Sequence, residues 1–97
     1  MIEVEWDEAK RLANLAKHRL DFRDVPFMDW GHALVIPDLR FDYPEPRFWA
    51  FAMLEGRLHM AVICYRGKKV RVISFRKAND KEIKLYGKKT QQQNASR

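Results

Sequence analysis

The chain of 97 residues is long enough for one folded domain and too short for two. Apolar residues make up 46% of it and aromatic residues 12%, which excludes a disordered chain and predicts a packed core. A single cysteine excludes an internal disulfide, and the acidic N-terminal segment lacks the apolar stretch of a signal peptide or membrane anchor. We therefore expect a cytoplasmic protein with no membrane association.

The charges are distributed unevenly along the chain. The net charge is +6, but residues 1–56 carry 7 basic and 11 acidic side chains, whereas residues 57–97 carry 12 and 2. This asymmetry predicts that the C-terminal half attracts polyanions, of which nucleic acid is the commonest in a cytoplasm. A basic surface that only keeps the protein soluble is the alternative.

The first predicted elements are a short strand over residues 2–6 and a helix over residues 8–18, with Asp7 as the N-cap of the helix. One side of this helix is apolar, and it comprises Ala9, Leu12, Ala13, Leu15 and Ala16. The other side is polar and mostly basic, and it comprises Lys10, Arg11, Asn14, Lys17 and His18. The pattern predicts an amphipathic helix whose basic side faces outward.

The next part of the chain is less regular. Residues 21–30 predict a short second helix, in which Pro26 is tolerated only in the first turn. Residues 37–46 contain three prolines and several acidic side chains, and they predict an exposed loop or a poorly paired sheet edge.

Three runs over residues 47–54, 57–66 and 69–76 predict strands joined by two tight hairpins. With a two-residue turn at Gly67 and Lys68, the expected pairs are Arg66 with Lys69, Cys64 with Arg71, Ala61 with Ser74, and His59 with Arg76. Because side chains alternate between faces, Arg66, Lys69 and Arg71 should share one face of the sheet. His59, Ser74 and Arg76 should share the other face, and an error of one residue in the register would exchange the partners.

A final helix is predicted after Asn79, which forms a capping box with Glu82, and it should end near Tyr86 or Lys89. Residues 1–89 are thus expected to form a single domain, and residues 90–97 a polar C-terminal tail. The order β-α-α-β-β-β-α predicts an α+β fold in which helices pack on one face of a mainly antiparallel sheet.

Basic side chains are the first candidates for function. Arginine presents a planar, permanently charged fork that matches phosphate oxygens and can stabilise the charge of a phosphoryl transition state. The candidates for RNA contact are Lys17, Arg57, Arg66, Arg71 and Lys81, with Arg76 at the end of the last strand. Ordinary charge at strand edges is the alternative interpretation.

Two other side chains are candidates for proton transfer or for orienting a substrate. His18 ends the first helix, where the helix dipole should stabilise the imidazolium form and raise its pKa. Tyr86 lies one helical turn after Glu82 and on the same side of the final helix. The alternatives are a histidine that only caps its helix and a tyrosine ring that only packs on the strands.

The sequence contains no Gly-rich phosphate loop, nucleophile elbow, metal-binding motif or paired-carboxylate pattern, so we expect neither a cofactor nor a metal. A nuclease remains compatible with these exclusions. RNA carries its own nucleophile in the 2′-hydroxyl, and the protein need only orient it, move protons and stabilise charge.

Two groups of residues match a known family in order and spacing. The first group is Trp6-Asp7, Lys10, Asn14, Lys17-His18 and Phe22. The second group is Gly56-Arg57-Leu58, Arg66-Gly67, the run from Arg71 to Arg76, Ala78, Glu82 and Tyr86. Together they span roughly residues 4–88, and the chain resembles the BrnT toxins.

This resemblance implies a RelE-like fold and a ribonuclease that inhibits translation, with His18, Arg76 and Tyr86 as its catalytic residues. It also implies neutralisation by a BrnA-type antitoxin, contact with DNA only indirectly through the antitoxin complex, and a dimer as one form of the toxin in that complex. The alternative is a non-catalytic basic module that binds RNA, DNA or an acidic protein segment. An RNA cleavage assay in the presence of a chelator separates the two.

Overall fold

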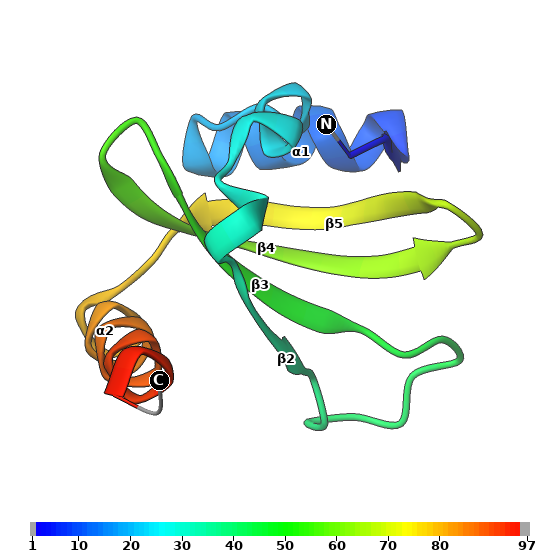
Figure 1. Ribbon diagram of the computed structural model, residues 1–97. Helices are drawn as coiled ribbons and strands as arrows, with labels where there is room; N and C mark the ends of the chain where they lie inside the picture. The colour runs from blue at the N-terminus through cyan, green and yellow to red at the C-terminus, as the bar shows by residue number, and fades with distance from the viewer. Residues whose placement is uncertain (1, 96–97) are drawn as a thin grey trace.

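The computed structural model describes residues 2–95, and its elements follow one another along the chain as a strand, a helix, two short 3-10 helices, four strands and a last helix. They are β1 (Val4–Trp6), α1 (Glu8–His18), η1 (Phe22–Phe27), η2 (Trp30–His32), β2 (Leu34–Pro37), β3 (Phe48–Leu54), β4 (Arg57–Arg66), β5 (Lys69–Lys77) and α2 (Asp80–Ala95). The strands form one sheet in the order β1-β5-β4-β3-β2 (Figure 1). Only β1 pairs in parallel, so the predicted α+β class and mainly antiparallel sheet are confirmed.

Three elements differ from the prediction. Strand β2 was missed because it has four residues and pairs only with β3, at the edge of the sheet. The second helix is the 3-10 helix η1, since Pro26 lies inside it and lacks the N–H that a regular α-helix needs. Helix α2 continues to Ala95 instead of ending near Tyr86 or Lys89. Residues 96–97 of the predicted tail lie outside the described part of the chain.

The register between β4 and β5 was predicted correctly near the turn and wrongly beyond it. Arg66 pairs with Lys69 and Cys64 with Arg71, but a β-bulge leaves Ile73 without a partner in the ladder. Beyond the bulge Ser74 lies opposite Val62, and Arg76 lies opposite Met60, where His59 had been expected. The extra residue therefore moves Ser74 and Arg76 to the same face of the sheet as Arg66 and Arg71.

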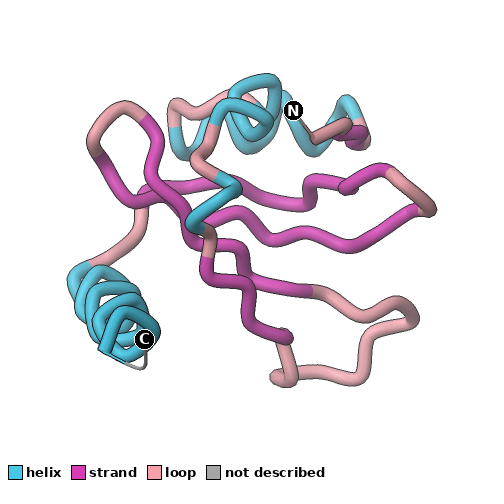
Figure 2. Tube along the Cα trace, viewed as in Figure 1, coloured by secondary structure: helices cyan, strands magenta, loops and turns pink. Residues whose placement is uncertain are grey.

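The two faces of the sheet are covered differently. The front face, toward the viewer in Figure 2, carries the larger core cluster, in which Phe22 and Val25 of η1 are fully buried against the sheet. We call the opposite side, which carries Met60, Val62 and Cys64, the rear face. Its cluster is smaller and receives Tyr86 of α2 at one end. The rest of the rear face remains available for a functional site.

Helix α1 lies along the sheet edge beside β5 (Figure 1) and faces it with the side predicted to be exposed. Arg11 and Asn14 are buried, at 7% exposure each, whereas Leu12 is 52% exposed. Arg11 pairs with Glu8 at 2.6 Å and with Asp21 at 3.0 Å, which compensates its charge. The prediction of an outward basic side is thus wrong at these two residues, because specific polar partners replace apolar packing.

Asn14 connects α1 to the open edge of β5. Strand β1 pairs with β5 only from Val70 to Val72, so the edge of β5 after Val72 is not paired with β1. The Asn14 side chain donates from Nδ2 to the Phe75 carbonyl at 2.8 Å and accepts from the Phe75 N–H at 3.0 Å. One amide side chain therefore continues the hydrogen bonding of the sheet and holds the C-terminal end of α1 beside β5.

Replacing Asn14 with Ala should leave both backbone groups of Phe75 buried without a partner. Each such group costs about 1–3 kcal/mol, so we expect a loss of about 2–5 kcal/mol in the free energy of unfolding. Urea denaturation measures it, with Gln91→Ala on the exposed surface of α2 as the control. A loss below about 0.5 kcal/mol for Asn14→Ala would contradict this role.

Candidate functional site

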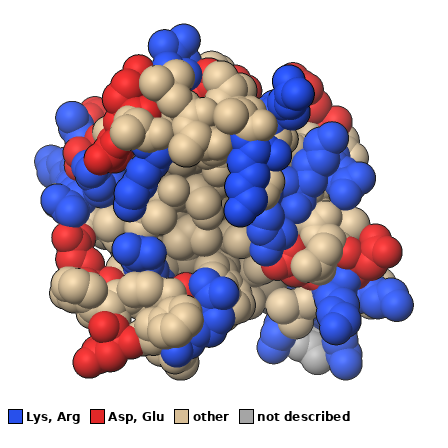
Figure 3. All heavy atoms as spheres, turned by 180° about the vertical axis from the view of Figure 1, so that it is seen from behind, with Lys and Arg blue, Asp and Glu red and all other residues tan. Residues whose placement is uncertain are grey.

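A cavity of about 450 Å³ lies on the rear face, between the end of α1 and the start of α2. Its lining residues come from six parts of the chain: Lys17, His18, Arg40, Trp49, Met60, Val62, Ser74, Arg76 and Glu82. Seen from this side, blue lysine and arginine groups surround a hollow of uncharged residues (Figure 3). The cavity brings together His18, Arg76 and Lys17, three of the residues singled out from the sequence.

Arg76 is oriented in this cavity by the first turn of α2. Its Nη1 and Nη2 atoms donate to the two carboxylate oxygens of Glu82 at 2.7 and 2.9 Å, and Nη1 also donates to the Lys77 carbonyl. Glu82 accepts from the Asn79 N–H, while Asn79 accepts from the Glu82 N–H, which confirms the predicted capping box. This pairing raises the pKa of Arg76 and lowers the pKa of Glu82, so both groups are charged.

His18 enters the cavity from the last turn of α1, whose end is capped by Arg19 in the left-handed conformation. Its pKa is lowered, first by burial and then by the nearby charges of Lys17 and Arg76. The prediction of a raised pKa at the helix C-terminus is therefore wrong, because burial and two neighbouring cations disfavour the imidazolium form. The imidazole is neutral at neutral pH and has the form required of a proton acceptor.

Arg40 is a residue of this cavity that the sequence analysis did not select. It belongs to the segment between β2 and β3, where Asp38 has a completely buried side chain. Asp38 accepts from Nε and Nη2 of Arg40, each at 3.0 Å, and from the Tyr43 hydroxyl at 2.9 Å. The guanidinium also lies over the indole of Trp49, 4.9 Å from its centroid. The segment predicted as an exposed loop thus contains a fixed buried carboxylate.

Nothing in the local sequence around Arg40 distinguishes it from a solvated charge. The one available signal was the pattern Asp38-x-Arg40 followed by aromatic residues, and that pattern is not specific. Trp49 is half-buried and lines the same cavity.

A second hollow of about 220 Å³ lies on the same face and contains two more of the predicted RNA contacts. Its lining residues are Lys10, Pro44, Glu45, Arg47, Cys64, Arg66, Arg71 and Ile73. Arg66 pairs with Glu45 at 2.7 Å, and Arg71 pairs with Glu5 at 3.3 Å. The rear face therefore carries basic groups well beyond the cavity of His18 and Arg76.

The structure places the remaining predicted residues elsewhere. Arg57 lies on the front face and donates to the Ala78 carbonyl at 3.1 Å. Lys81 is exposed on α2. The Tyr86 hydroxyl donates to the His32 carbonyl at 2.8 Å, and burial raises its pKa. Arg57, Lys81 and Tyr86 are thus not brought together with His18 and Arg76.

A cavity of about 530 Å³, larger than the rear one, is on the front face and includes Arg57 and His59. The Nδ1 atom of His59 is 2.8 Å from the Arg57 carbonyl, so this nitrogen acts as a hydrogen-bond donor. Asp24 and Glu55 also line the cavity and oppose the binding of a polyanion. We therefore prefer the smaller rear cavity as the candidate site.

Among residues 2–95, no three His, Cys, Asp or Glu side chains come together in an arrangement suited to a metal ion. No helix of the described part has both the length and the apolar character needed to cross a membrane.

The chain is similar to a known family and to a solved structure. The sequence profile of a family described as the ribonuclease toxin BrnT of type II toxin-antitoxin systems matches residues 6–82. The 1.1 Å crystal structure of the Brucella abortus ribonuclease toxin BrnT is similar in fold, with a TM-score of 0.67 and 32% sequence identity. The match covers 82% of this chain and 100% of that chain. The chain belongs to the BrnT ribonuclease toxin family. No curated protein matches the sequence.

A ribonuclease toxin of a type II toxin-antitoxin system implies an RNA substrate and a cognate antitoxin partner. The matched segment contains His18, Arg40, Arg76 and Glu82, so the whole polar lining of the rear cavity lies within the BrnT part of the chain. Tyr86 and the rest of α2 follow that segment, whereas the resemblance seen in the sequence had extended to about residue 88.

The pKa of His18 should lie below 6.5 and should rise when a neighbouring charge is removed. We expect Lys17→Met to move it upward, and Lys81→Met, on the surface of α2, to leave it unchanged. Proton NMR titration of the imidazole resonances measures both, with His18→Gln to assign the signal. A wild-type pKa above 6.5 would contradict the dominance of burial and cationic neighbours.

Proposed function

We propose that the chain is a metal-independent endoribonuclease that cleaves RNA in the rear cavity and thereby inhibits translation. The observation that carries this proposal is the placement of a neutral histidine beside Arg76 and Lys17 in one cavity. A base accelerates cleavage of RNA by its own 2′-hydroxyl, and cations stabilise the negative charge that develops in the transition state.

In the proposed reaction His18 accepts the proton of a 2′-hydroxyl, and the 2′-oxygen attacks the adjacent phosphorus. The bond from phosphorus to the 5′-oxygen breaks, and this oxygen takes a proton from water and leaves as a 5′-hydroxyl. The hydroxide that remains takes the proton held by His18, which returns the imidazole to its neutral form. The other product ends in a 2′,3′-cyclic phosphate. Arg76 and Lys17 stabilise the negative charge that develops on the phosphate oxygens.

The role proposed for Arg76 is consistent with its pairing to Glu82. A guanidinium has five N–H donors, of which Glu82 and the Lys77 carbonyl use three. The Nε hydrogen and one Nη2 hydrogen remain on one edge, and this edge matches two phosphate oxygens. For Tyr86 we propose a structural role, because its hydroxyl donates to the backbone carbonyl of His32 at the end of η2.

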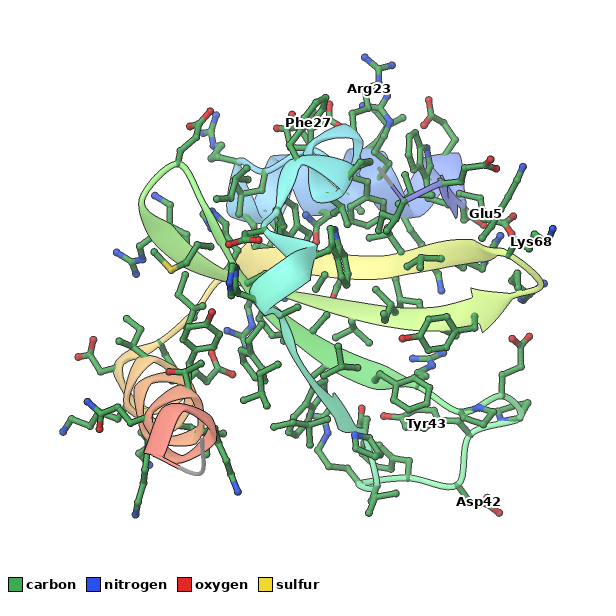
Figure 4. The ribbon with its side chains drawn as sticks, in the orientation of Figure 1. Glu5, Arg23, Phe27, Asp42, Tyr43 and Lys68 are labelled. Carbon is green, nitrogen blue, oxygen red and sulfur yellow. The ribbon has the colours of Figure 1, made fainter. Side chains whose placement is uncertain are left out.

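His18→Ala should lower the rate of RNA cleavage by about 10²–10⁴-fold through loss of the base. Arg76→Gln should lower it by about 10²–10³-fold through loss of charge stabilisation. Arg23→Gln is the matched control, since Arg23 is exposed on η1 and points away from the sheet (Figure 4). Labelled RNA is incubated with each purified protein in EDTA, and the products are tested for 2′,3′-cyclic phosphate ends.

Cleavage by His18→Ala at the wild-type rate would overturn the proposed site. RNA binding without cleavage by the wild-type protein would instead favour the non-catalytic module. Addition of the same variants to a cell-free translation reaction tests the proposed inhibition of translation, which should disappear with cleavage.

We further propose that a BrnA-type antitoxin is the partner and that it binds α1. The apolar side of α1 faces solvent with Leu12 52% exposed, and Ala9, Ala13 and Ala16 are exposed along the same helix. Lys17 and His18 continue that helix into the cavity. A partner with apolar and acidic side chains would cover this surface and the cations together. In such a complex the antitoxin, and not this chain, would contact DNA.

Leu12→Glu should weaken the complex with the antitoxin at least tenfold, because it places a charge in an apolar contact and repels acidic partner groups. RNA cleavage by the free variant should be unchanged, since Leu12 does not line the cavity. Isothermal titration calorimetry with the neighbour-encoded antitoxin measures affinity, and Val35→Glu at the far sheet edge is the control. Equal affinity for both variants and the wild-type protein would exclude α1 as the contact.

A further inference from the structure

The rear cavity contains a second arginine whose position is fixed as firmly as that of Arg76. Arg40 donates to Asp38 through three groups: its backbone N–H at 3.1 Å, Nε at 3.0 Å and Nη2 at 3.0 Å. The Asp38 carboxylate is buried, and the backbone N–H of Asp38 donates to the Arg47 carbonyl at 2.8 Å. The side chain of Arg40 is nevertheless 58% exposed, so a fixed guanidinium faces a site open to solvent.

Asp38 binds Arg40 and Glu82 binds Arg76, and the two carboxylates occupy different edges of the guanidinium group. Asp38 takes the Nε and Nη2 edge of Arg40, which leaves its Nη1 and Nη2 edge. Glu82 takes the Nη1 and Nη2 edge of Arg76, which leaves its Nε and Nη2 edge. Each arginine therefore keeps one pair of parallel N–H donors, the arrangement that grips two oxygens of a phosphate.

The two arginines also repel each other. The charge of Arg40 lowers the pKa of Arg76, against the stronger effect of Glu82, so the two cations are close enough to interact. Bringing like charges to one cavity is unfavourable unless an anion lies between them. Asp38 and Glu82 reduce this cost in the unbound protein while holding the donors in place.

We propose that Arg40 and Arg76 both bind the same phosphodiester of the RNA, which lies between them, and that Asp38 is the positioning residue for Arg40. This inference rests on the proposed ribonuclease function and adds to it a specific contact, made by a residue of the β2–β3 segment. The opposing interpretation is that Asp38, Arg40 and Tyr43 only stabilise that segment.

The test uses a 2′-O-methyl hexanucleotide, which cannot be cleaved because it lacks the 2′-hydroxyl nucleophile. Five further probes each carry a neutral methylphosphonate in place of one of its phosphodiester linkages. Fluorescence anisotropy gives the dissociation constant of each probe for the wild-type protein, Arg40→Gln, Arg76→Gln and Asp38→Asn. Gln is chosen at position 40 because it retains a donor for the buried Asp38. Arg23→Gln is the control, and thermal unfolding verifies the fold of each variant.

We expect one methylphosphonate to weaken binding to the wild-type protein about tenfold. Arg40→Gln and Arg76→Gln should each weaken binding of the unmodified probe to a similar degree, and both should lose discrimination at that same linkage. Asp38→Asn should reduce the discrimination in part, while Arg23→Gln should retain it in full. If Asp38 and Arg40 only stabilise the β2–β3 segment, their variants should unfold at a lower temperature but still bind the one methylphosphonate probe more weakly than the unmodified probe.

The shared phosphate contact would be contradicted if folded Arg40→Gln still bound that one methylphosphonate probe as weakly, relative to the unmodified probe, as the wild-type protein does. It would also be contradicted if Arg40→Gln and Arg76→Gln lost this difference at two different linkages. In either case a loss of discrimination by Arg76→Gln would leave the proposed site standing. Wild-type affinity and wild-type RNA cleavage by Arg76→Gln would instead contradict the proposed function itself.

Discussion

The β-bulge at Ile73 determines which side chains reach the rear face of the sheet. Without it, strict alternation from the Gly67 turn would place Arg76 opposite His59 on the front face, away from His18. With it, Arg76 lies opposite Met60 and meets both the end of α1 and the first turn of α2. The position of the catalytic arginine proposed here thus depends on one unpaired residue in β5, and bulges are known to redirect side chains beside active sites.

Helix α1 depends on polar contacts that a simple amphipathic pattern does not reveal. Its buried side is formed by Arg11 and Asn14, whose partners are carboxylates and a strand backbone, and its alanines and Leu12 face outward. Such contacts fix an orientation more strictly than apolar packing, because each requires a particular atom in a particular place. The result is a helix that delivers Lys17 and His18 to the cavity and leaves an apolar surface for a partner.

The sequence was sufficient for features that depend on neighbouring residues. The hairpin at Gly67 and Lys68, the capping box of Asn79 and Glu82, and the helix start at Asp7 all follow from local chemistry. Features that depend on distant residues were missed. The bulge leaves no clear mark in the sequence of β5, the burial of Asn14 requires Phe75, and the position of Arg40 requires the buried Asp38 and the ring of Trp49.

For the candidate site, the sequence therefore supplied His18, Arg76 and Lys17 but not their common surroundings. Resemblance to a family identified the same residues without explaining why they meet. It also suggested Tyr86, whose hydroxyl is bonded to the His32 carbonyl in the structure.

The pairing of Arg76 with Glu82 has a consequence for how the protein is made. The cavity wall begins at Lys17, near the start of the chain, and is completed only by Glu82 in the first turn of α2. A growing chain that has not yet released this turn from the ribosome lacks the carboxylate that orients Arg76. A domain generally folds as a unit, so a nascent chain without this turn has not yet formed the site. The complete site therefore forms only after the chain has been made and released from the ribosome at least as far as Glu82.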